Sequence, residues 1–451
     1  MEKNLTTGSV FKNVVLFSLP YLLSYFLQTL YGMADLFIIG QFEGVASTTA
    51  VSIGSQVMHM LTVMIVGLSM GTTVSVGQTV GAGDRKQAAH NIGNTVILFL
   101  VVSIALTAIL LSLVHPIVVA MSTPTDAVSG TVTYLTICFI GIPFITSYNI
   151  ISSIFRGLGD SKSPMCFIAT ACAANIALDY LFMGVLHLGP AGAALGTTLS
   201  QAISVVVSLT VILKRRSIVL KKSDFKPCRA VMGKILGIGI PIAFQDGLIQ
   251  VAFIITIIAN QRGLNDAAAV GIVEKVISFL FLVPSSMLST VSALGAQNIG
   301  AGKPERAIQT LRYAVMLAAG FGVLASIAIQ FTAESIVSLF TDPSTADGAA
   351  VVRFGGQYLR GYIFDCIFAG IHFSFSGFFC ACRKSGLSFL HNILAIVLMR
   401  VPGVYVTSKL FPATLLPMGL ATAAGSLLSV VICLIAFGVI RRKSTLVLVE
   451  E

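Results

Sequence analysis

Five carboxylic acids lie inside long apolar stretches of this chain, and these side chains are the first candidates for chemistry. They are Asp35, Asp179, Asp246, Glu274 and Asp365. An ionisable group at bilayer depth costs about 2.5–3.5 kcal/mol on insertion scales, so its presence there predicts a function or a buried ion pair. Three basic side chains in similar stretches are available as partners, namely Lys275, Arg360 and Arg400.

Asp35 and Asp179 are predicted to lie about 9–12 Å below the outer surface, because each precedes the outer end of its helix by about six to eight residues. Asn175 stands one turn below Asp179 on the same helix face. With no basic residue expected at that depth, this group suits a shared proton or a small hard cation such as sodium. Asp35, Asn175 and Asp179 are therefore the predicted cation-coupling site and, for sodium, the predicted metal ligands. Local pairing of each side chain with Ser, Thr or backbone is the alternative.

A second polar group is predicted in the C-terminal half, and it is the candidate substrate cavity. Its members are Gln245, Asp246, Tyr362, Asp365 and Arg400. Asp365 stands among aromatic residues, which together would attract an organic cation by charge and by cation–π contact. The alternative is a structural ion pair between Asp365 and Arg400.

The elements that position these residues are predicted to be membrane-spanning helices. Apolar residues make up 56% of the 451 residues and charged residues only 10%, with a mean hydropathy of +0.93. A soluble domain carries about 25% charged residues. Twelve spans are predicted, at roughly 12–39, 50–80, 90–114, 131–154, 164–186, 192–213, 232–260, 269–298, 308–331, 353–379, 388–408 and 415–440.

The chain repeats itself, which predicts two related halves of six spans each. The sequence Gly-Gln-Thr-Val-Gly-Ala-Gly at 77–83 returns as Ala-Gln-Asn-Ile-Gly-Ala-Gly at 296–302, about 219 residues later. Phe-Ser-Leu-Pro at 17–20 returns as Ile-Gly-Ile-Pro at 238–241, about 221 residues later. An even number of spans per half gives both halves the same orientation, an arrangement typical of secondary transporters.

The repeat also divides the chain. We predict an N-terminal lobe over residues 1–213, a cytoplasmic linker over 214–231 and a C-terminal lobe over 232–451. The residue that matches Asp35 in the second half is Thr256, so the coupling site is predicted in the N-terminal lobe alone.

Basic residues gather on one side of the predicted membrane. Most of the 28 Lys and Arg residues fall in loops on the side that also holds both termini, so the positive-inside rule predicts cytoplasmic termini. The net charge of +10 follows from this asymmetry and suits anionic lipid, and it does not indicate nucleic-acid binding. The eight Cys and six His residues show no ligand spacing apart from a lone pair, Cys380 and Cys382, so we expect no bound cofactor.

Several short motifs in a fixed order make this chain similar to a known family. They are Phe-Arg-Gly-Leu-Gly-Asp-Ser-Lys at 155–162, Asn-Ile-Ala-Leu-Asp at 175–179, Gly-Pro-Ala-Gly-Ala-Ala at 189–194 and the Gly-Ala-Gly turns at 81–83 and 300–302. By these motifs, and over essentially its whole length, the chain resembles the MATE (multidrug and toxic compound extrusion) transporters of prokaryotes.

The resemblance implies an all-α membrane protein with two six-helix lobes that form a V around a central cavity. It implies export of small amphipathic, often cationic compounds, driven by inward movement of protons or sodium ions through alternating access. The family's cation site in the N-terminal lobe maps onto Asp35, Asn175 and Asp179. Its acidic site in the C-terminal lobe is less clearly matched, with Asp365 or Asp246 as the occupant. We expect a monomer in the bacterial inner membrane.

Other functions fit parts of the sequence. A lipid-linked oligosaccharide flippase of the same superfamily would carry more basic residues at cavity depth, where this chain has at least as many acids. A major facilitator transporter would follow Gly83-Asp84-Arg85 with Gly and Arg, where this chain has Ala88 and Ala89. A membrane-embedded enzyme is not favoured because no protease or hydrolase motif is present. A channel would not require buried acids in one half.

Overall fold

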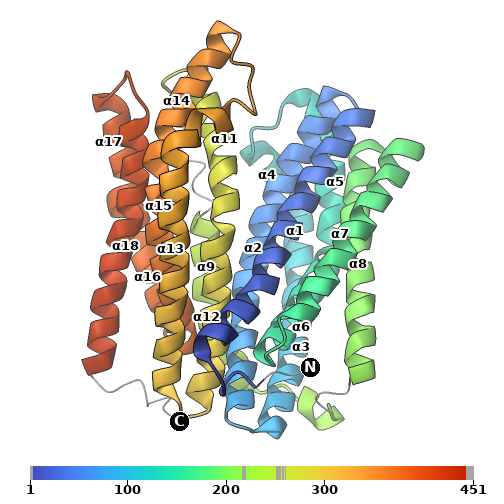
Figure 1. The fold of residues 1–451 in the computed structure, drawn as a ribbon. Coiled ribbons are helices and arrows are strands. Elements are labelled where there is room, and N and C mark those ends of the chain that lie inside the picture. Colours follow the sequence, from blue (N-terminus) through green and yellow to red (C-terminus); the bar gives the residue numbers. More distant parts are fainter. Residues whose placement is uncertain (1–3, 216–219, 250–254, 256–257, 260, 443–451) are drawn as a thin grey trace. The chain divides into compact units, whose positions relative to one another are not determined.

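The structure is a computed structural model that describes residues 4–215, 220–249, 255, 258–259 and 261–442. Within these residues all regular secondary structure is helical (Figure 1), and 11 helices are long and apolar enough to cross a membrane. A twelfth span is supplied by α5 (Thr125–Ile140) and α6 (Ile142–Gly157), which are bent by 48° relative to each other. The predicted all-α membrane fold is confirmed, and each predicted span overlaps one of these helices.

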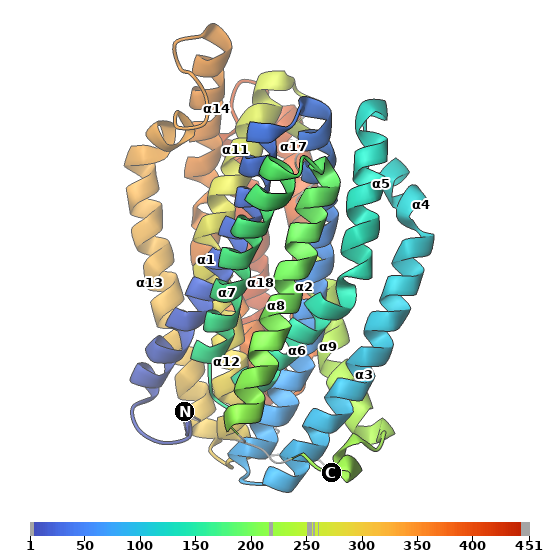
Figure 2. The ribbon, with the colours of Figure 1, turned by 90° about the vertical axis from the view of Figure 1, so that its right-hand side faces the viewer.

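The described residues of the first chain half form ten helical segments. In chain order they are α1 (Val10–Phe42), α2 (Val45–Gly81), α3 (Arg85–Ser112), α4 (Val114–Ala120), α5, α6, α7 (Lys162–Asp179), η1 (Tyr180–Val185), α8 (Gly189–Arg215) and η2 (Lys222–Phe225). The π-helix η1 continues α7, and α7 packs along α8 (Figure 2).

The second half follows the same plan. Its described helices are α9 (Arg229–Ile249), α11 (Leu264–Leu280), α12 (Leu282–Gly300), α13 (Pro304–Val337), α14 (Ala346–Tyr362), α15 (Phe364–Ala381), α16 (Ser385–Ala395), η3 (Ile396–Arg400), α17 (Val401–Leu410) and α18 (Leu416–Arg442). The π-helix η3 joins α16 to α17 within one span. The predicted span 232–260 coincides with α9 as far as Ile249, and part of its remainder lies outside the described residues.

The chain forms two compact units, each with its own apolar core. Unit 1 contains Leu19–Ala243, and unit 2 contains Leu5–Ser18 together with the chain from Phe244 onward. The core of unit 1 gathers around side chains such as Tyr134 and Phe139, and that of unit 2 is a separate cluster of buried residues. The units do not follow the chain halves at two helices, because the start of α1 belongs to unit 2 and the start of α9 to unit 1.

Four helix hairpins share one turn, which reveals the internal repeat in the backbone. In each turn the residue after the helix cap has a positive φ: 77° at Gly83, 87° at Gly159, 67° at Gly302 and 56° at Arg383. The next amide always bonds back to the last turn of the preceding helix, as from Asp84 N to Thr79 O at 3.0 Å. Three of the four positions are glycine, which adopts this conformation without a steric penalty, and Arg383 adopts it at some cost.

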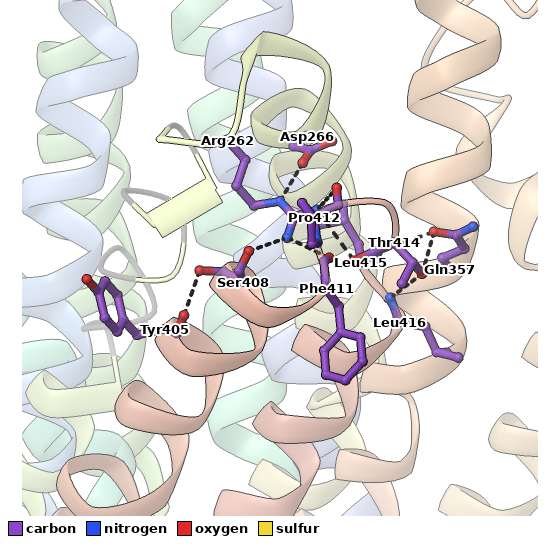
Figure 3. Close-up of polar contacts among 10 residues, drawn as sticks. All are labelled: Arg262, Asp266, Gln357, Tyr405, Ser408, Phe411, Pro412, Thr414, Leu415 and Leu416. Atoms are coloured by element: carbon purple, nitrogen blue, oxygen red, sulfur yellow. Dashed lines mark hydrogen bonds and ion pairs between the residues drawn. The ribbon is translucent and has the colours of Figure 1, made fainter.

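Arg262 ties together separate segments of unit 2 (Figure 3). Its Nε donates to Asp266 Oδ2 at 2.6 Å, near the start of α11. Its two NH groups donate to the carbonyls of Ser408 (2.9 Å), Phe411 (3.2 Å) and Pro412 (2.8 Å). These carbonyls lie at and beyond the end of α17, where a helix leaves its last acceptors without intrahelical donors.

The same loop is held from its other side by α14. Gln357 Oε1 accepts hydrogen bonds from Thr414 Oγ1 at 2.9 Å and from Leu415 N at 3.2 Å (Figure 3). The connection between α17 and α18 is therefore fixed by one side chain from near the start of α11 and one from α14.

Replacing Arg262 by alanine is expected to destabilise the protein by about 3 kcal/mol, because the nearly buried Asp266 carboxylate and the carbonyls after α17 lose their shared donor. The thermal unfolding midpoint of the purified protein measures this loss. Arg353→Ala is the matched control, since Arg353 is an exposed arginine of α14 that contacts only the ring face of Phe354 in the described structure. An equal fall in both variants would contradict the role given to Arg262.

Candidate functional site

Asp35, Asn175 and Asp179 come together in the interior of unit 1. Asp35 lies on α1, and Asn175 and Asp179 lie near the end of α7. Their exposed fractions are 2%, 0% and 0%, so none of the three side chains faces solvent or lipid. Asp179, Asn175 and Thr197 of α8 are the polar side chains that lie near the Asp35 carboxyl group.

Among the described residues, one direct hydrogen bond joins members of this cluster. Thr197 Oγ1 donates to Asp35 Oδ2 at 3.2 Å. Asp35 Oδ1, both carboxyl oxygens of Asp179 and both amide atoms of Asn175 are buried and have no hydrogen-bond partner among the described residues. A buried polar atom without a partner costs about 1–3 kcal/mol, and more if it is charged. The four oxygens among these five atoms are chemically able to hold a proton or a small cation.

Neighbouring helices make room for the Asp179 carboxyl group. Directly after Asp179, α7 gives way to the π-helix η1, and π-helical turns occur frequently at functional sites. On α8, a Cβ atom at Gly196 would collide with Asp179 Oδ1, so glycine leaves the space that this carboxyl group occupies. The next residue, Thr197, donates to Asp35. Helix α8 therefore supplies both the space and the hydrogen bond.

The described residues supply no basic group to balance the two acids. The groups that act on Asp35 and Asp179 are each other, Asn175 and Thr197. Charges interact strongly in a low-dielectric interior, so two unpaired carboxylates there are far more costly than on a surface. The arrangement is chemically suited to share one proton between the carboxyl groups. It is equally suited to bind a small hard cation through carboxylate, amide and hydroxyl oxygens.

Gly196 and Thr197 are members of this site that the sequence alone did not identify. Both belong to the run of mostly small residues at 189–198, and such runs also predict close helix packing. The feature that distinguishes Thr197 is its depth in the membrane, because its hydroxyl group lies at the level of two acids on other helices. Depth in turn depends on the register between α1, α7 and α8, which only the fold supplies.

In unit 2, Tyr362, Asp365 and Arg400 form a second polar cluster. Arg400 NH2 donates to Tyr362 OH at 2.6 Å and lies 3.4 Å from Asp365 Oδ2. The guanidinium also lies 5.6 Å from the centre of the Tyr362 ring. Asp365 is fully buried and the Arg400 side chain is 15% exposed. Asp365 and Arg400 thus form the buried ion pair that was the structural alternative for these residues.

Glu274 extends this cluster. Its Oε1 accepts a hydrogen bond from Tyr358 OH at 3.2 Å, and the Tyr358 ring lies 5.5 Å from that of Tyr362. Arg400 acts electrostatically on both Glu274 and Asp365. The cluster therefore contains two acids and one base, whereas the cluster in unit 1 contains two acids and no described base.

Gln245 and Asp246 lie on α9, apart from these interactions. Gln245 is fully buried, and both of its amide atoms have no hydrogen-bond partner among the described residues. The side chain of Asp246 is partly exposed. Within the described part of the chain, no hydrogen bond or ion pair joins either residue to Asp365 or Arg400.

The MatE family model matches residues 20–181 and 241–406. The starts of the two matches lie 221 residues apart (241 − 20) and their ends 225 residues apart (406 − 181), so the model recognises each half of the internal repeat. The probable multidrug resistance protein YpnP of Bacillus subtilis is 30% identical over 421 residues, which are 93% of this chain and 92% of that protein. The FAD transporter of Shewanella oneidensis is 25% identical over 85% of each chain.

A solved structure supports the same fold. It is described as the outward-facing conformation of a multidrug resistance MATE family transporter of the MOP superfamily. It matches with a TM-score of 0.89 over 98% of both chains at 22% sequence identity. At this identity the match establishes a shared fold.

Asparagine at positions 35 and 365 is expected to have opposite effects on stability. Asp35→Asn removes a buried carboxyl group for which the described residues supply no basic partner, so the thermal unfolding midpoint should stay the same or rise. Asp365→Asn leaves the Arg400 guanidinium without its carboxylate, so the midpoint should fall by the equivalent of about 3 kcal/mol. Scanning fluorimetry of both purified variants at one pH measures the contrast. Equal falls in the two variants would refute it.

Proposed function

The chain belongs to the MatE family of multidrug and toxic compound extrusion transporters, and on this premise we propose that it exports small amphipathic molecules in exchange for an inward-moving proton or sodium ion. The membrane-spanning fold and a relative named for multidrug resistance support export. The observation that carries the coupling is the buried cluster of Asp35, Asn175 and Asp179 with its unpartnered oxygens. Family membership also removes the major facilitator alternative.

Charge balance is the proposed basis of coupling. A bound proton or sodium ion neutralises one of the two carboxyl groups, and the oxygens of Asn175 and Thr197 complete the shell of a bound sodium ion. Without the ion, unit 1 holds unbalanced charge, which favours a conformation that opens the site to water. The ion drives export only if it binds one conformation more tightly than the other, and the exported molecule must favour the ion-free conformation.

The second cluster is the proposed determinant of substrate charge. With Glu274 and Asp365 against Arg400, it has one more acid than base, which supports a preference for cations. The Tyr362 ring offers a face for cation–π contact. Gln245 and Asp246 would add an amide and a further acid from α9. No cofactor is part of this proposal, because the transported ion supplies the driving force.

A second candidate function is export or flipping of a phosphate-bearing molecule, including a lipid-linked oligosaccharide. Arg400 supports it, because a guanidinium group binds phosphate through two parallel hydrogen bonds. A relative at 25% identity is named as an FAD transporter. The ion pair with Asp365 counts against this candidate, since the acid occupies the guanidinium group that a phosphate would need.

The proposed setting is the inner membrane of a bacterium, with both termini in the cytoplasm and the protein acting as a monomer. The many membrane-crossing helices and the bacterial relatives support a multi-pass membrane protein. The orientation rests on the excess of basic residues on one side of the sequence.

Asp35→Asn is expected to abolish ion-driven export while the protein remains folded, because the amide can neither carry a proton nor balance a sodium ion. Efflux of a fluorescent lipophilic cation from pump-deficient cells measures this, with a proton gradient or a sodium gradient imposed separately. Asp126→Asn is the matched control, since Asp126 is an exposed acid. The gradient that drives the wild type identifies the ion. Export by Asp35→Asn at the wild-type rate would exclude coupling at this site.

Gly196→Ala is expected to weaken coupling by displacing the Asp179 carboxyl group. The new methyl group would occupy the position of Asp179 Oδ1, so the ion concentration for half-maximal export should rise about tenfold, the effect of about 1.4 kcal/mol. Gly32→Ala on α1 is the control, because nothing lies within 4 Å of a Cβ atom there. Unchanged ion dependence in Gly196→Ala, with normal expression, would show that Asp179 does not bind the ion.

A further inference from the structure

Arg156 is a buried basic side chain that the proposed function does not use. It lies near the end of α6, within the motif at 155–162, and only 6% of the residue is exposed. An arginine stays protonated in proteins, so this position carries a permanent positive charge inside unit 1. A buried charge is costly unless it is paired, so the groups around Arg156 decide what it does.

The described residues supply no acid to balance this charge. The Arg156 guanidinium forms no hydrogen bond or ion pair with them, and three tyrosines are the groups that act on it electrostatically. The nearest acid along the chain, Asp160, is directed to the start of α7, where its Oδ1 accepts from Ser163 N at 3.0 Å. Arg156 therefore differs from Arg400, whose charge is balanced by Asp365.

Aromatic rings lie against the guanidinium group. The Cζ atom of Arg156 is 4.5 Å from the centre of the Tyr21 ring, which is a cation–π contact. Tyr25 stacks on Tyr21, with the ring centres 6.3 Å apart and the planes 28° apart. The cation–π contact attracts the charge, but it supplies no oxygen acceptor for the five N–H donors of a guanidinium group. These donors are therefore available to an external acceptor.

Two hydroxyl groups share the face of α6 that carries Arg156. Tyr148, Ser152 and Arg156 are spaced by four residues, so they form one row along the helix, the Arg156 row. Long helical side chains point back toward the start of their helix, so the guanidinium extends over the turn that carries Ser152. Tyr148 OH and Ser152 Oγ are buried and have no hydrogen-bond partner among the described residues. The Arg156 row therefore combines two hydroxyl donors with a cationic donor.

Helix α2 fixes the position of the Arg156 row from the adjacent face of α6. Ser153 Oγ donates to Ser69 Oγ at 2.8 Å, and Thr73 Oγ1 donates to the Ser153 carbonyl at 3.1 Å. One turn later, a Cβ atom at Gly157 would lie 2.9 Å from the Thr73 carbonyl oxygen, so glycine allows the two helices to approach closely. The backbone that carries the Arg156 row is thus held in one register.

We propose that the Arg156 row binds the carboxylate or phosphate group of a small aromatic molecule. Such a group supplies negative charge and several acceptor oxygens, and a guanidinium group binds it through two parallel hydrogen bonds. The stacked rings of Tyr21 and Tyr25 offer a face for the aromatic part of the molecule. A small molecule suits this site better than a phospholipid, because every member of the Arg156 row is at most 6% exposed.

The proposed anion site is separate from the acid pair of unit 1. Tyr25 and Tyr21 precede Asp35 on α1 by 10 and 14 residues (35 − 25 and 35 − 21), which correspond to about 15 and 21 Å along a helix. Asp35 and Asp179 are not among the groups that act on Arg156. Binding at the Arg156 row is independent of the proposed function, whereas export of the bound molecule rests on it.

Thermal unfolding of the purified protein tests the site without any transport measurement. A thiol-reactive fluorogenic dye reports the transition, since Cys138 and Cys433 are buried and the chain contains no tryptophan. Sodium benzoate should raise the unfolding midpoint in a saturable manner, because a ligand of the folded state stabilises it. Benzamide, the neutral isostere, should not raise it. The sodium concentration is held constant with sodium chloride, so that sodium binding at Asp35 contributes equally to every sample.

Substitutions then assign the effect to the Arg156 row. Arg156→Gln should abolish the rise with benzoate, whereas Arg312→Gln, at an exposed position of α13, should keep it. Tyr148→Phe should raise the half-saturating benzoate concentration about tenfold, because it removes one hydrogen bond to a charged group. Tyr134→Phe is its matched control, since the Tyr134 hydroxyl group pairs with Ser55 at 3.1 Å, and it should leave that concentration unchanged.

Two further anions distinguish the sources of the bound group. Phenyl phosphate should reproduce the effect of benzoate. A saturable rise with dioleoylphosphatidic acid alone would assign the site to lipid and overturn the small-molecule ligand. No rise with either aromatic anion, or an equal rise in the wild type and Arg156→Gln, would overturn the site itself.

Efflux from pump-deficient cells tests whether the bound molecule is exported. Cells that expel a fluorescent lipophilic cation should also expel carboxyfluorescein, an aromatic carboxylate, and Arg156→Gln should lose export of carboxyfluorescein alone. Export of only the cation by the wild type would overturn a role of the Arg156 row in transport. Absence of both would count against the proposed function and leave the binding result standing.

Discussion

The unbalanced pair of buried carboxyl groups is the constraint on which unit 1 depends. Asp35 and Asp179 are buried, and the described residues place no base beside them, so the surrounding helices must hold two acidic groups close together in the interior. The π-helical turn after Asp179, the glycine at 196 and the hydroxyl group of Thr197 all serve this placement. In the proposed function, a transferable positive charge balances this site, and the electrostatics of the fold is thereby linked to exchange across a membrane.

Unit 2 repeats the scaffold but solves the electrostatic problem differently. Its buried acid Asp365 is paired with Arg400. The neutral hydroxyl group of Tyr362 accepts a hydrogen bond from the guanidinium group and orients it. Duplication therefore produced two similar helix sets, as the four related turns show, and the chemistry of the two sets diverged. In unit 1 the described residues place no base beside the acid pair, whereas in unit 2 the side chain of Arg400 supplies the positive charge.

Sequence reasoning reached the spans, the repeat and the grouping of Asp35, Asn175 and Asp179 at one depth, because hydropathy and depth along a helix are local properties of the chain; their role as a coupling site stays a prediction. It left open whether Asp365 pairs with Arg400, since that depends on how two helices face each other. It missed Thr197 because a hydroxyl group in a small-residue run has no distinct signature. It assigned α1 and α9 whole to their own halves, because no pattern in one sequence reports which unit a helix start packs against. The boundaries at 213 and 232 thus remain predictions drawn from the repeat alone.

The first part of α1 belongs to unit 2 and the first part of α9 belongs to unit 1, and this affects how the protein folds during synthesis. When the ribosome has completed α8, unit 1 still lacks the start of α9, whose Val231 and Ile235 belong to the same buried cluster as Val76 and Ile92. Leu5–Ser18 is synthesised well before Lys303, Arg306 and Tyr313, so its contacts with them form only after α13 has been made. Neither unit is therefore complete when only the six spans of its own chain half have entered the membrane. Two halves produced as separate polypeptides would each present a site that only the other chain can fill.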